Sequence, residues 1–366
     1  MYVWQIGFTG TQLTTLHGPK TKPAIDFADV IINTSGRTLG EQALLEARTK
    51  YRNKFHDGYV VIGSAEPPCH FKGMKGHPYT QGCIKVFPVM ISPKLNGMRM
   101  LAQHLGGELV QCRTYLNRTL HHLKHLEKEV LAFSAYLPAF ATLDGELYRH
   151  GMNFHQIMSA VKTVNSDHAD LGNIMFCVFD IYYQENPPAE ERYTLLVNAH
   201  RRYTEERGGG EEVITIVPHY IANSHEEVMS CKDQWVAAGY EGAVVKRMAG
   251  KSVVGSKEYE LSRYKFGRTQ CVYKVKDSFD EEGTIVDIKS AEGKEKGAAK
   301  LKIRDQYGIE FFVRFGTVEE RKMWMQNPYM VLNKQFTFKY TRRSPDNVPI
   351  EPEGVAFRVG ANGEFE

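Results

Sequence analysis

The first 60 residues alternate between apolar and polar positions and then change to a helical spacing. The segments YVWQIGF and QLTTL have the period-two alternation of strands. The segment SGRTLGEQALLEARTKYRNKF predicts a helix, with Ser35 or Thr38 as its N-cap and Leu44, Leu45 and Ala47 among its apolar positions. This part of the chain is therefore expected to form a small module of its own.

Strand and helix patterns mix in the middle of the chain. Proline and glycine pairs within residues 67–83 predict a linker. Beyond it, VFPVMISPKL predicts a strand, and ATLDGELY, IMFCVFDIYY and EGAVVKR are short apolar runs beside charged residues, as in strands that line a polar cleft. Helical spacing appears in LHHLKHLEKEVLAF, through Leu120, Leu123, Leu126 and Leu131, and EEVMSCKDQWVAAG predicts a second helix.

From Asp277 onward, short strand patterns follow one another with turns between them. These are GTIVDIK, AAKLKIRD, IEFFVRFG and KQFTFKYTRR, with VEERKMWMQNP as one short helix. This texture predicts a small β-barrel of the OB type. The whole pattern predicts an α+β protein with an accessory module and linker over 1–85, a catalytic domain over 86–276 and an OB-fold domain over 277–366.

The composition adds little beyond a globular class. The 366 residues are 42% hydrophobic and 24% charged, which is ordinary for a soluble protein. The start of the chain has no basic segment followed by an apolar run, and no apolar stretch approaches the roughly 20 residues of a membrane span. We expect an intracellular protein without a membrane partner, in the cytoplasm, a nucleus or a viral replication site, and not secreted.

Cysteines and net charge exclude some classes of site. The six cysteines are scattered without a C-x-x-C pair, which argues against a disulfide framework and favours a reducing compartment. Cys69 and His70 are adjacent but lack a second ligand pair, so a zinc site is not expected. A net charge of +3 does not itself indicate nucleic-acid binding, but basic residues cluster in 94–99 and 334–343.

The segment PKLNGMR contains the strongest candidate nucleophile, Lys94. An attacking lysine must be neutral, and a partly desolvated cleft with cations nearby favours the neutral amine. Gly97 would allow backbone to approach a bound nucleotide. Taken alone, the segment could equally be a surface turn between strands.

Four further segments carry candidate ligand contacts. Glu146 in DGELY could reach a ribose hydroxyl or a hydrated Mg²⁺, although Asp-Gly also predicts a hairpin turn. Phe179 in VFDIYY could stack on a purine, or lie in the core. Glu241 begins EGAVVKR at a strand mouth. Lys274 and Lys276 in YKVK are two apart, which places both on one strand face.

The order of these segments resembles a known superfamily. K-x-N-G-x-R, CRTYLNR, DGELY, VFDIYY, EGAVVKR and YKVK are similar to the motifs of the covalent ligases and capping enzymes, and most similar to small ATP-dependent DNA ligases of viruses and phages. The resemblance covers about residues 86–358. It implies an ATP-grasp-like nucleotidyltransferase domain with antiparallel sheets, followed by an OB-fold β-barrel.

The resemblance also implies roles for individual residues. Lys94 resembles the lysine that becomes adenylylated. Arg113 is similar to the arginine that binds the 5′-phosphate of a nick, and Arg118 to a backbone contact. Arg358 matches the arginine of the last motif, which faces pyrophosphate. The implied contacts to ATP or AMP are Ser92, Arg99, Glu146, Phe179, Glu241, Lys274 and Lys276.

The implied reaction seals nicked duplex DNA in three transfers. ATP donates AMP to the lysine, AMP passes to the 5′-phosphate, and the 3′-hydroxyl expels it. Mg²⁺, which Mn²⁺ can replace, would be held by Glu146 and Glu241 through water. The expected enzyme is a monomer that serves DNA replication, repair or recombination.

Two departures from the family pattern keep alternatives open. Asn96 stands where the family usually has aspartate, and Val359-Gly360-Ala361 follow Arg358 instead of the usual x-Asp-Lys. An RNA ligase, a GTP-dependent mRNA capping guanylyltransferase and a non-catalytic nick-binding module are the alternatives. EGAVVKR and the barrel pattern favour the DNA ligase. The 1–85 module resembles WGR-like add-on segments, which implies that it binds DNA or packs on the catalytic domain.

Overall fold

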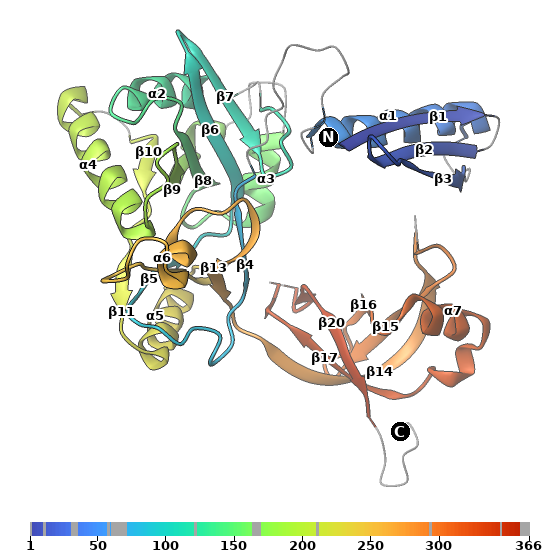
Figure 1. The fold of residues 1–366 in the computed structure, drawn as a ribbon. Coiled ribbons are helices and arrows are strands. Elements are labelled where there is room, and N and C mark those ends of the chain that lie inside the picture. Colours follow the sequence, from blue (N-terminus) through green and yellow to red (C-terminus); the bar gives the residue numbers. More distant parts are fainter. Residues whose placement is uncertain are drawn as a thin grey trace. The chain divides into compact units, whose positions relative to one another are not determined.

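Two compact units make up the chain, Met1–Lys274 and Val275–Glu366 (Figure 1). The computed structural model describes residues 2–9, 12–30, 36–56, 59, 72–120, 123–162, 170–209, 212–292, 295–344 and 346–358. Within these ranges, no helix combines the length and the apolar character that crossing a membrane requires. The described cysteines are free thiols, whereas Cys69 and His70 lie outside the described residues.

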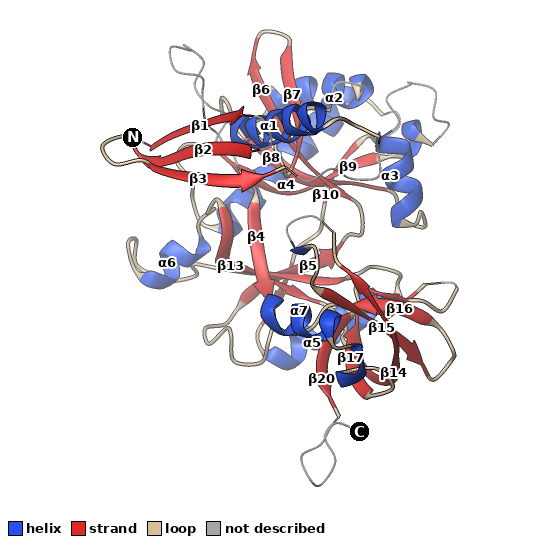
Figure 2. Ribbon diagram, turned by 90° about the vertical axis from the view of Figure 1, so that its right-hand side faces the viewer, coloured by secondary structure: helices blue, strands red, loops and turns tan. Residues whose placement is uncertain are grey.

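The amino-terminal module is a three-stranded sheet with one helix (Figure 2). Its elements are β1 (Tyr2–Thr9), β2 (Gln12–Pro19), β3 (Ala24–Asp29) and α1 (Leu39–His56). Helix α1 packs against β1 and β2 and buries Ala43 and Ala47 beside Leu13. The predicted strands and helix are confirmed, but β3 was not predicted.

Helix α1 begins with reciprocal hydrogen bonds and presents two leucines to solvent. The backbone N–H of Thr38 donates to Glu41 at 2.8 Å, and the backbone N–H of Glu41 donates to the Thr38 hydroxyl at 3.3 Å. Thr38 is thus the cap, and Ser35, the other candidate, lies outside the described residues. Leu44 and Leu45 are 38% and 42% exposed, so the buried stripe runs through the alanines instead.

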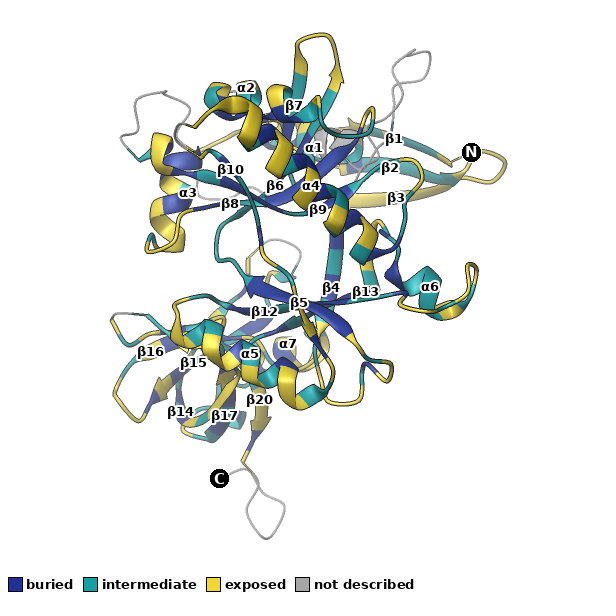
Figure 3. Cartoon of the chain, turned by 90° about the vertical axis from the view of Figure 1, so that its left-hand side faces the viewer, coloured by how far each residue is buried: buried dark blue, intermediate teal, exposed yellow. Residues whose placement is uncertain are grey.

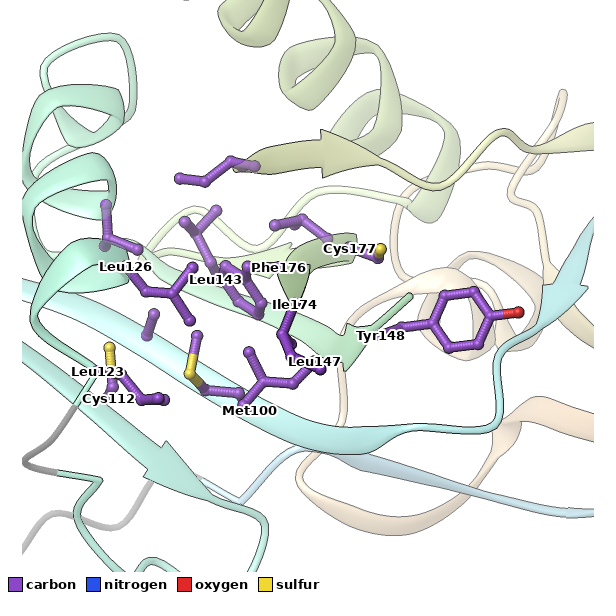
Figure 4. Packing of buried hydrophobic residues seen from close by; sticks show 14 of the residues in the cluster. Met100, Cys112, Leu123, Leu126, Leu143, Leu147, Tyr148, Ile174, Phe176 and Cys177 are labelled. Atoms are coloured by element: carbon purple, nitrogen blue, oxygen red, sulfur yellow. The ribbon is translucent and has the colours of Figure 1, made fainter. Parts of the chain in front are cut away.

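One five-stranded sheet has the order β10-β9-β8-β6-β7. All its pairs are antiparallel except β10 with β9, which is parallel. Helices α2 and α4 contact this sheet and each other, and Figure 4 shows part of the apolar core beneath them. The elements are β6 (Met98–Gly106), β7 (Leu109–Thr114), α2 (Lys124–Ser134), β8 (Thr142–Tyr148), α3 (Phe154–Lys162), a 3-10 turn (Leu171–Asn173), β9 (Met175–Tyr182), α4 (Ala189–Arg207) and β10 (Ile214–Ile216).

A second five-stranded sheet has the order β11-β5-β12-β13-β4. Its central strands β5 and β12 are mostly buried (Figure 3). Strand β4 pairs in parallel with β13, so the predicted linker over 67–83 is wrong for this stretch, and residues 67–71 lie outside the described ones. The elements are β4 (Met74–Pro78), β5 (Val89–Lys94), β11 (Tyr220–Ala222), α5 (His225–Ala237), β12 (Gly242–Arg247), α6 (Lys257–Ser262) and β13 (Gly267–Val275).

The carboxy-terminal unit is a five-stranded antiparallel sheet of the order β16-β15-β14-β17-β20 with one helix. The predicted strands and helix are present, but among the described residues the sheet is open and does not close into the predicted barrel. Aromatic residues fill its core, among them Trp324, Phe336 and Phe338. The elements are β14 (Phe279–Ser290), β15 (Ala299–Asp305), β16 (Glu310–Val313), α7 (Val318–Gln326), a 3-10 turn (Pro328–Met330), β17 (Gln335–Tyr340), β18 (Arg342–Arg343), β19 (Pro349–Ile350) and β20 (Glu353–Phe357).

The α+β class with an OB-fold domain is confirmed, with one correction to its detail. The two large sheets of the first unit are mixed, because the β10–β9 and β13–β4 pairs are parallel. The Asp144-Gly145 pair forms no hairpin turn and lies inside β8. Helix α2 begins at Lys124, so Leu120 and Leu123 are buried in the segment before it.

Gly97 lies in the turn between β5 and β6, and its backbone closely approaches that of β8. An ideal Cβ at residue 97 would lie 2.2 Å from the carbonyl oxygen of Leu147 and 2.9 Å from Cγ of Glu146. The neighbour that excludes a side chain here is the protein's own backbone. The expectation that this glycine gives room for a nucleotide is therefore replaced by a packing requirement within the protein.

We expect Gly97→Ala to lower the free energy of unfolding by about 1–3 kcal/mol, because the added methyl group forces β6 and β8 apart. Gly40→Ala in α1 is the matched control, since its Cβ would meet nothing within 4 Å, and it should stabilise the same unit by up to about 1 kcal/mol. Urea unfolding followed by circular dichroism measures both. Equal effects of the two substitutions would contradict the close approach.

Candidate active site

A cavity of about 200 Å³ lies between the two large sheets of the first unit. Strands β4, β5, β12 and β13 contribute to it from one sheet, and β6, β8 and β9 contribute from the other. Its lining contains both charges and apolar side chains. The lining residues are Met74, Gly76, Ser92, Pro93, Lys94, Leu95, Arg99, Asp144, Glu146, Phe179, Asp180, Val244, Lys246, Val272 and Lys274.

Lys94 and Glu241 lie at adjacent ends of two paired strands, β5 and β12. Lys94 is the last residue of β5 and lies opposite Gly242 at the start of β12. The backbone N–H of Glu241 donates to the Lys94 carbonyl at 3.0 Å. The Lys94 ammonium donates to the Glu241 carboxylate, and the two side chains are only 17% and 16% exposed. The strand register therefore brings together two residues that are far apart in sequence.

Glu146 lies on β8 opposite Arg99 of β6. Burial raises the pKa of Glu146 to about 7, while Lys94 and Arg99 act in the opposite direction and Glu241 adds to the increase. Near neutral pH its carboxyl group is thus divided between the protonated and the ionised form. The predicted residues Lys94, Glu146 and Glu241 form one electrostatic group.

Arg99 is committed to a buried carboxylate. Its Nε donates to Asp144 Oδ1 at 2.8 Å, a second nitrogen donates to the other oxygen, and Asp144 is fully buried. Burial alone would lower the pKa of Arg99, but the pairing with Asp144 raises it above its usual value. The Tyr264 hydroxyl also donates to Asp144. The expected contact of Arg99 with a nucleotide would therefore have to use guanidinium N–H groups that do not already bond to Asp144.

Phe179 lies between two cations. Its ring centroid is 5.4 Å from the Arg99 guanidinium carbon and 5.6 Å from the Lys246 ammonium. Such cation–π contacts fix the ring at the cavity wall. The position is compatible with the predicted packing of Phe179 on a purine.

A second buried ion-pair group lies behind Phe179. Arg192 donates to Asp180 at 2.8 Å, and the Lys246 ammonium is 2.9 Å from the other carboxylate oxygen of Asp180. Burial would raise the pKa of Asp180, but Arg192 and Lys246 hold it well below its usual range. Burial lowers the pKa of Lys246, and Asp180 only partly offsets this.

Asp144, Asp180 and Lys246 also line the cavity but were not predicted from the sequence. Asp144 is two residues before Glu146 on the same strand and so faces the same side, which means that period-two alternation from Glu146 would have found it. Asp180 directly follows Phe179, and Lys246 lies five residues after Glu241, so alternation from the predicted residues points to neither.

The two lysines of YKVK are separated by the end of a strand. Lys274 is in β13 and lines the cavity, together with the buried Ser92. Strand β13 ends at Val275. Lys276 belongs to the second unit and forms an ion pair with Glu351 at 3.0 Å. The expectation that both lysines share one strand face is therefore wrong.

Three further arginines were candidates for phosphate contacts. Arg113 on β7 is 1% exposed and donates to the Asn117 side chain at 2.9 Å, while its Nε and Nη2 have no hydrogen-bond partner among the described residues. Burial lowers the pKa of Arg113 to about 10. Arg118 is exposed. Arg358 in the second unit forms an ion pair with Glu282, and Val359-Gly360-Ala361 lie outside the described residues.

Comparisons with known proteins agree on one family. The model of the ATP dependent DNA ligase domain matches residues 79–275. The DNA ligase of the Kenyan pig isolate of African swine fever virus is 24% identical over 353 residues, covering 90% of this chain and 80% of that protein. The DNA ligase of the Malawian tick isolate is 24% identical over 355 residues, with the same coverage.

Solved structures share the fold. A structure from work on Lig E DNA ligases as minimal DNA-binding scaffolds has a TM-score of 0.59 and 21% identity, covering 78% of this chain and 99% of that chain. The structure named Pmar-Lig_Pre has a TM-score of 0.62 and 18% identity, covering 79% and 67%. Because the family model spans more than half of the sequence, the chain belongs to the ATP-dependent DNA ligases.

Proposed function

We propose that this ATP-dependent DNA ligase seals nicks with a 3′-hydroxyl and a 5′-phosphate through an AMP carried on Lys94. The observation that carries the proposal is the contact of the Lys94 amine with Glu241 at a cavity that Glu146 and Lys274 also line. An amine nucleophile with carboxylates and further ammonium groups in one enclosed site is suited to nucleotidyl transfer.

In the first step, the nitrogen of Lys94 attacks the α-phosphorus of ATP. The nitrogen–phosphorus bond forms, the bond to the bridging oxygen breaks, and pyrophosphate leaves with that electron pair. The amine loses a proton, and Glu241 is the carboxylate in contact with it, so Glu241 takes the proton-accepting position. Lys274 and Lys246 supply positive charge for the phosphate oxygens.

In the second and third steps, the phosphate at the nick takes the place of the lysine. A 5′-phosphate oxygen attacks the adenylyl phosphorus, and the bond to Lys94 breaks. The 3′-hydroxyl then attacks the 5′-phosphorus, forms the phosphodiester bond and expels AMP. Such transfers depend on positioning and charge stabilisation more than on covalent chemistry by the protein.

Arg113 supports a phosphate site for the second step. A buried guanidinium normally has partners for its nitrogens, yet Nε and Nη2 of Arg113 have none among the described residues. A phosphate oxygen would accept from both. Arg118 is exposed and is suited to a solvated backbone contact instead.

Glu146 and Glu241 fit a magnesium ion. Mg²⁺ prefers oxygen ligands and is commonly bound through one or two carboxylates together with substrate phosphates. The described residues contain no group of three or more His, Cys, Asp and Glu side chains suited to a metal. The ion, or Mn²⁺ in its place, would neutralise phosphate charge when bound.

The remaining modules are assigned to substrate contacts. Residues 86–276 carry adenylylation. Lys276, at the junction with the OB-fold domain, and Arg358, within that domain, contact nucleotide phosphates. The 1–85 module contacts DNA or the catalytic domain, and Leu44, Arg48 and Tyr51 support this as exposed residues on one face of α1. The enzyme acts inside the cell as a monomer, with salt-sensitive binding to nicked duplexes.

Lys94→Ala should abolish the covalent adduct, because it removes the cavity amine that is in ion-pair contact with Glu241. Incubation with radiolabelled ATP and Mg²⁺, followed by denaturing electrophoresis, measures it. Lys85→Ala, at an exposed position, is the control and should label normally. Full labelling of Lys94→Ala would overturn the assignment, and labelling from GTP instead of ATP would indicate capping chemistry.

Glu146→Gln should change how stability depends on pH. The folded protein keeps the Glu146 proton up to about pH 7, whereas an ordinary glutamate releases it near 4.5. The stabilising contribution is therefore complete below about pH 4.5 and is lost as the pH rises through about 7. The glutamine variant does not titrate, so it should gain on the order of 1–3 kcal/mol over the wild type between about pH 5.5 and 8.5. Calorimetry at both pH values measures the difference in unfolding free energy between the variant and the wild type. A difference that is the same at the two pH values would refute the prediction.

Arg113→Ala should affect the second step and spare the first. Loss of a charged hydrogen bond to phosphate predicts roughly 30- to 100-fold slower AMP transfer from the enzyme to a nick. Retained self-labelling with ATP shows that the variant is folded, and Arg118→Ala should slow transfer far less. An equal loss of both steps would instead place Arg113 in the structural core.

A further inference from the structure

Three aromatic residues, Tyr148, His150 and Tyr240, are close in sequence to Glu146 or Glu241 and have no role in the proposed reaction. Tyr148 follows Glu146 by two residues on β8, so both side chains leave the same face of the strand. Tyr240 directly precedes Glu241. His150 lies in the turn after β8. All three residues come from the segments that carry Glu146 and Glu241.

Contacts join the three rings into a chain from the core to the surface. Tyr148 is buried, and Figure 4 shows its hydroxyl directed away from the aliphatic residues of the cluster. That hydroxyl forms a hydrogen bond of 2.8 Å with Nδ1 of His150. The His150 ring then packs on Tyr240, with centroids 4.8 Å apart and planes inclined by 42°. His150 is exposed and thus bridges a core tyrosine to the residue before Glu241.

The backbone around Tyr240 and Glu241 is permissive. Gly239 precedes this pair with φ +91°, and Gly242 follows it with φ +149°, conformations that glycine adopts at little cost. Hydrogen bonds from the N–H of Tyr240 to the Trp235 carbonyl (2.9 Å), and from the N–H of Glu241 to the Lys94 carbonyl (3.0 Å), hold the main chain. These main-chain hydrogen bonds do not fix the directions of the side chains. The contacts of the Tyr240 ring can therefore influence the direction of the neighbouring Glu241 side chain.

We infer that the packing of the His150 ring on Tyr240 positions the Glu241 carboxylate against the Lys94 amine. His150 is a positioning residue, because it acts through Tyr240 and does not contact the reacting groups. Gly239 belongs to the same arrangement, since a Cβ there would lie 3.7 Å from the His150 ring. The inference rests on the proposed role of Lys94 as the nucleophile.

The first test measures formation of the AMP adduct in the full chain. His150→Ala should lower kcat for adduct formation about three- to tenfold, the range expected for loss of one aromatic pair, with KM for ATP changed less than about twofold. His150→Phe retains a ring on Tyr240 and should recover most of the rate. His155→Ala removes another exposed histidine with an aromatic neighbour and should behave as the wild type.

The second test needs neither ATP nor metal. An amine-acylating reagent, with mass spectrometry of the peptides, measures the reactivity of each lysine. His150→Ala should raise the reactivity of Lys94 about three- to tenfold as its ion pair loosens, while the buried Lys246 and the exposed Lys339 of the second unit stay unchanged. A slower adduct with a more accessible amine is the combination that only a positioning role gives.

Two results would overturn the inference. One is wild-type kcat and Lys94 reactivity in His150→Ala. The other is a lower melting temperature together with raised reactivity of both Lys94 and Lys246. That result would indicate that the His150 ring only stabilises the fold. Failure of the proposed function is distinguishable from both, because the wild-type enzyme itself would then form no adduct on Lys94.

Discussion

Charged side chains enclosed between two sheets must find partners, and this requirement organises the first unit. Removing an ion from water costs several kcal/mol unless an opposite charge and hydrogen bonds compensate. Lys94 meets Glu241, Arg99 meets Asp144, and Arg192 and Lys246 share Asp180. Lys94–Glu241 and Arg99–Asp144 each join two strands of one sheet that are far apart in sequence. The Lys246–Asp180 pair joins β12 of one sheet to β9 of the other, and so holds the two sheets together beside the cavity.

The distribution of charge that results is suited to a phosphate substrate. Lys246 and Arg192 share one carboxylate, and Lys274 lines the same cavity. Burial raises the pKa of the lining residue Glu146 to about 7, so less negative charge opposes the lysines of the cavity near neutral pH. The nucleotide proposed to bind there would add negative charge beside them. Glycines at the same place keep the backbones close, as Gly97 does against β8.

Sequence patterns located the strands that carry the chemistry, because alternation and short apolar runs are local properties. Strands β8, β9 and β12 occur where DGELY, VFDIYY and EGAVVKR predict them. Strand β4 was missed because its glycine and proline residues predict a linker, and only its pairing with β13 makes it a strand. The pairing of Arg99 with Asp144 and the separation of Lys276 from Lys274 depend on tertiary contacts and on where a strand ends. Neither is encoded in spacing along the chain.

The claim that Lys94 is the amine that accepts AMP is tested most directly by locating the adduct. The wild-type protein is incubated with ATP and Mg²⁺, digested, and its peptides are sequenced by mass spectrometry under conditions that preserve phosphoramidates. The account predicts one added AMP, on the peptide containing Lys94, which disappears when nicked duplex DNA is supplied. An AMP on any other lysine, or an adduct that nicked DNA does not discharge, would contradict it.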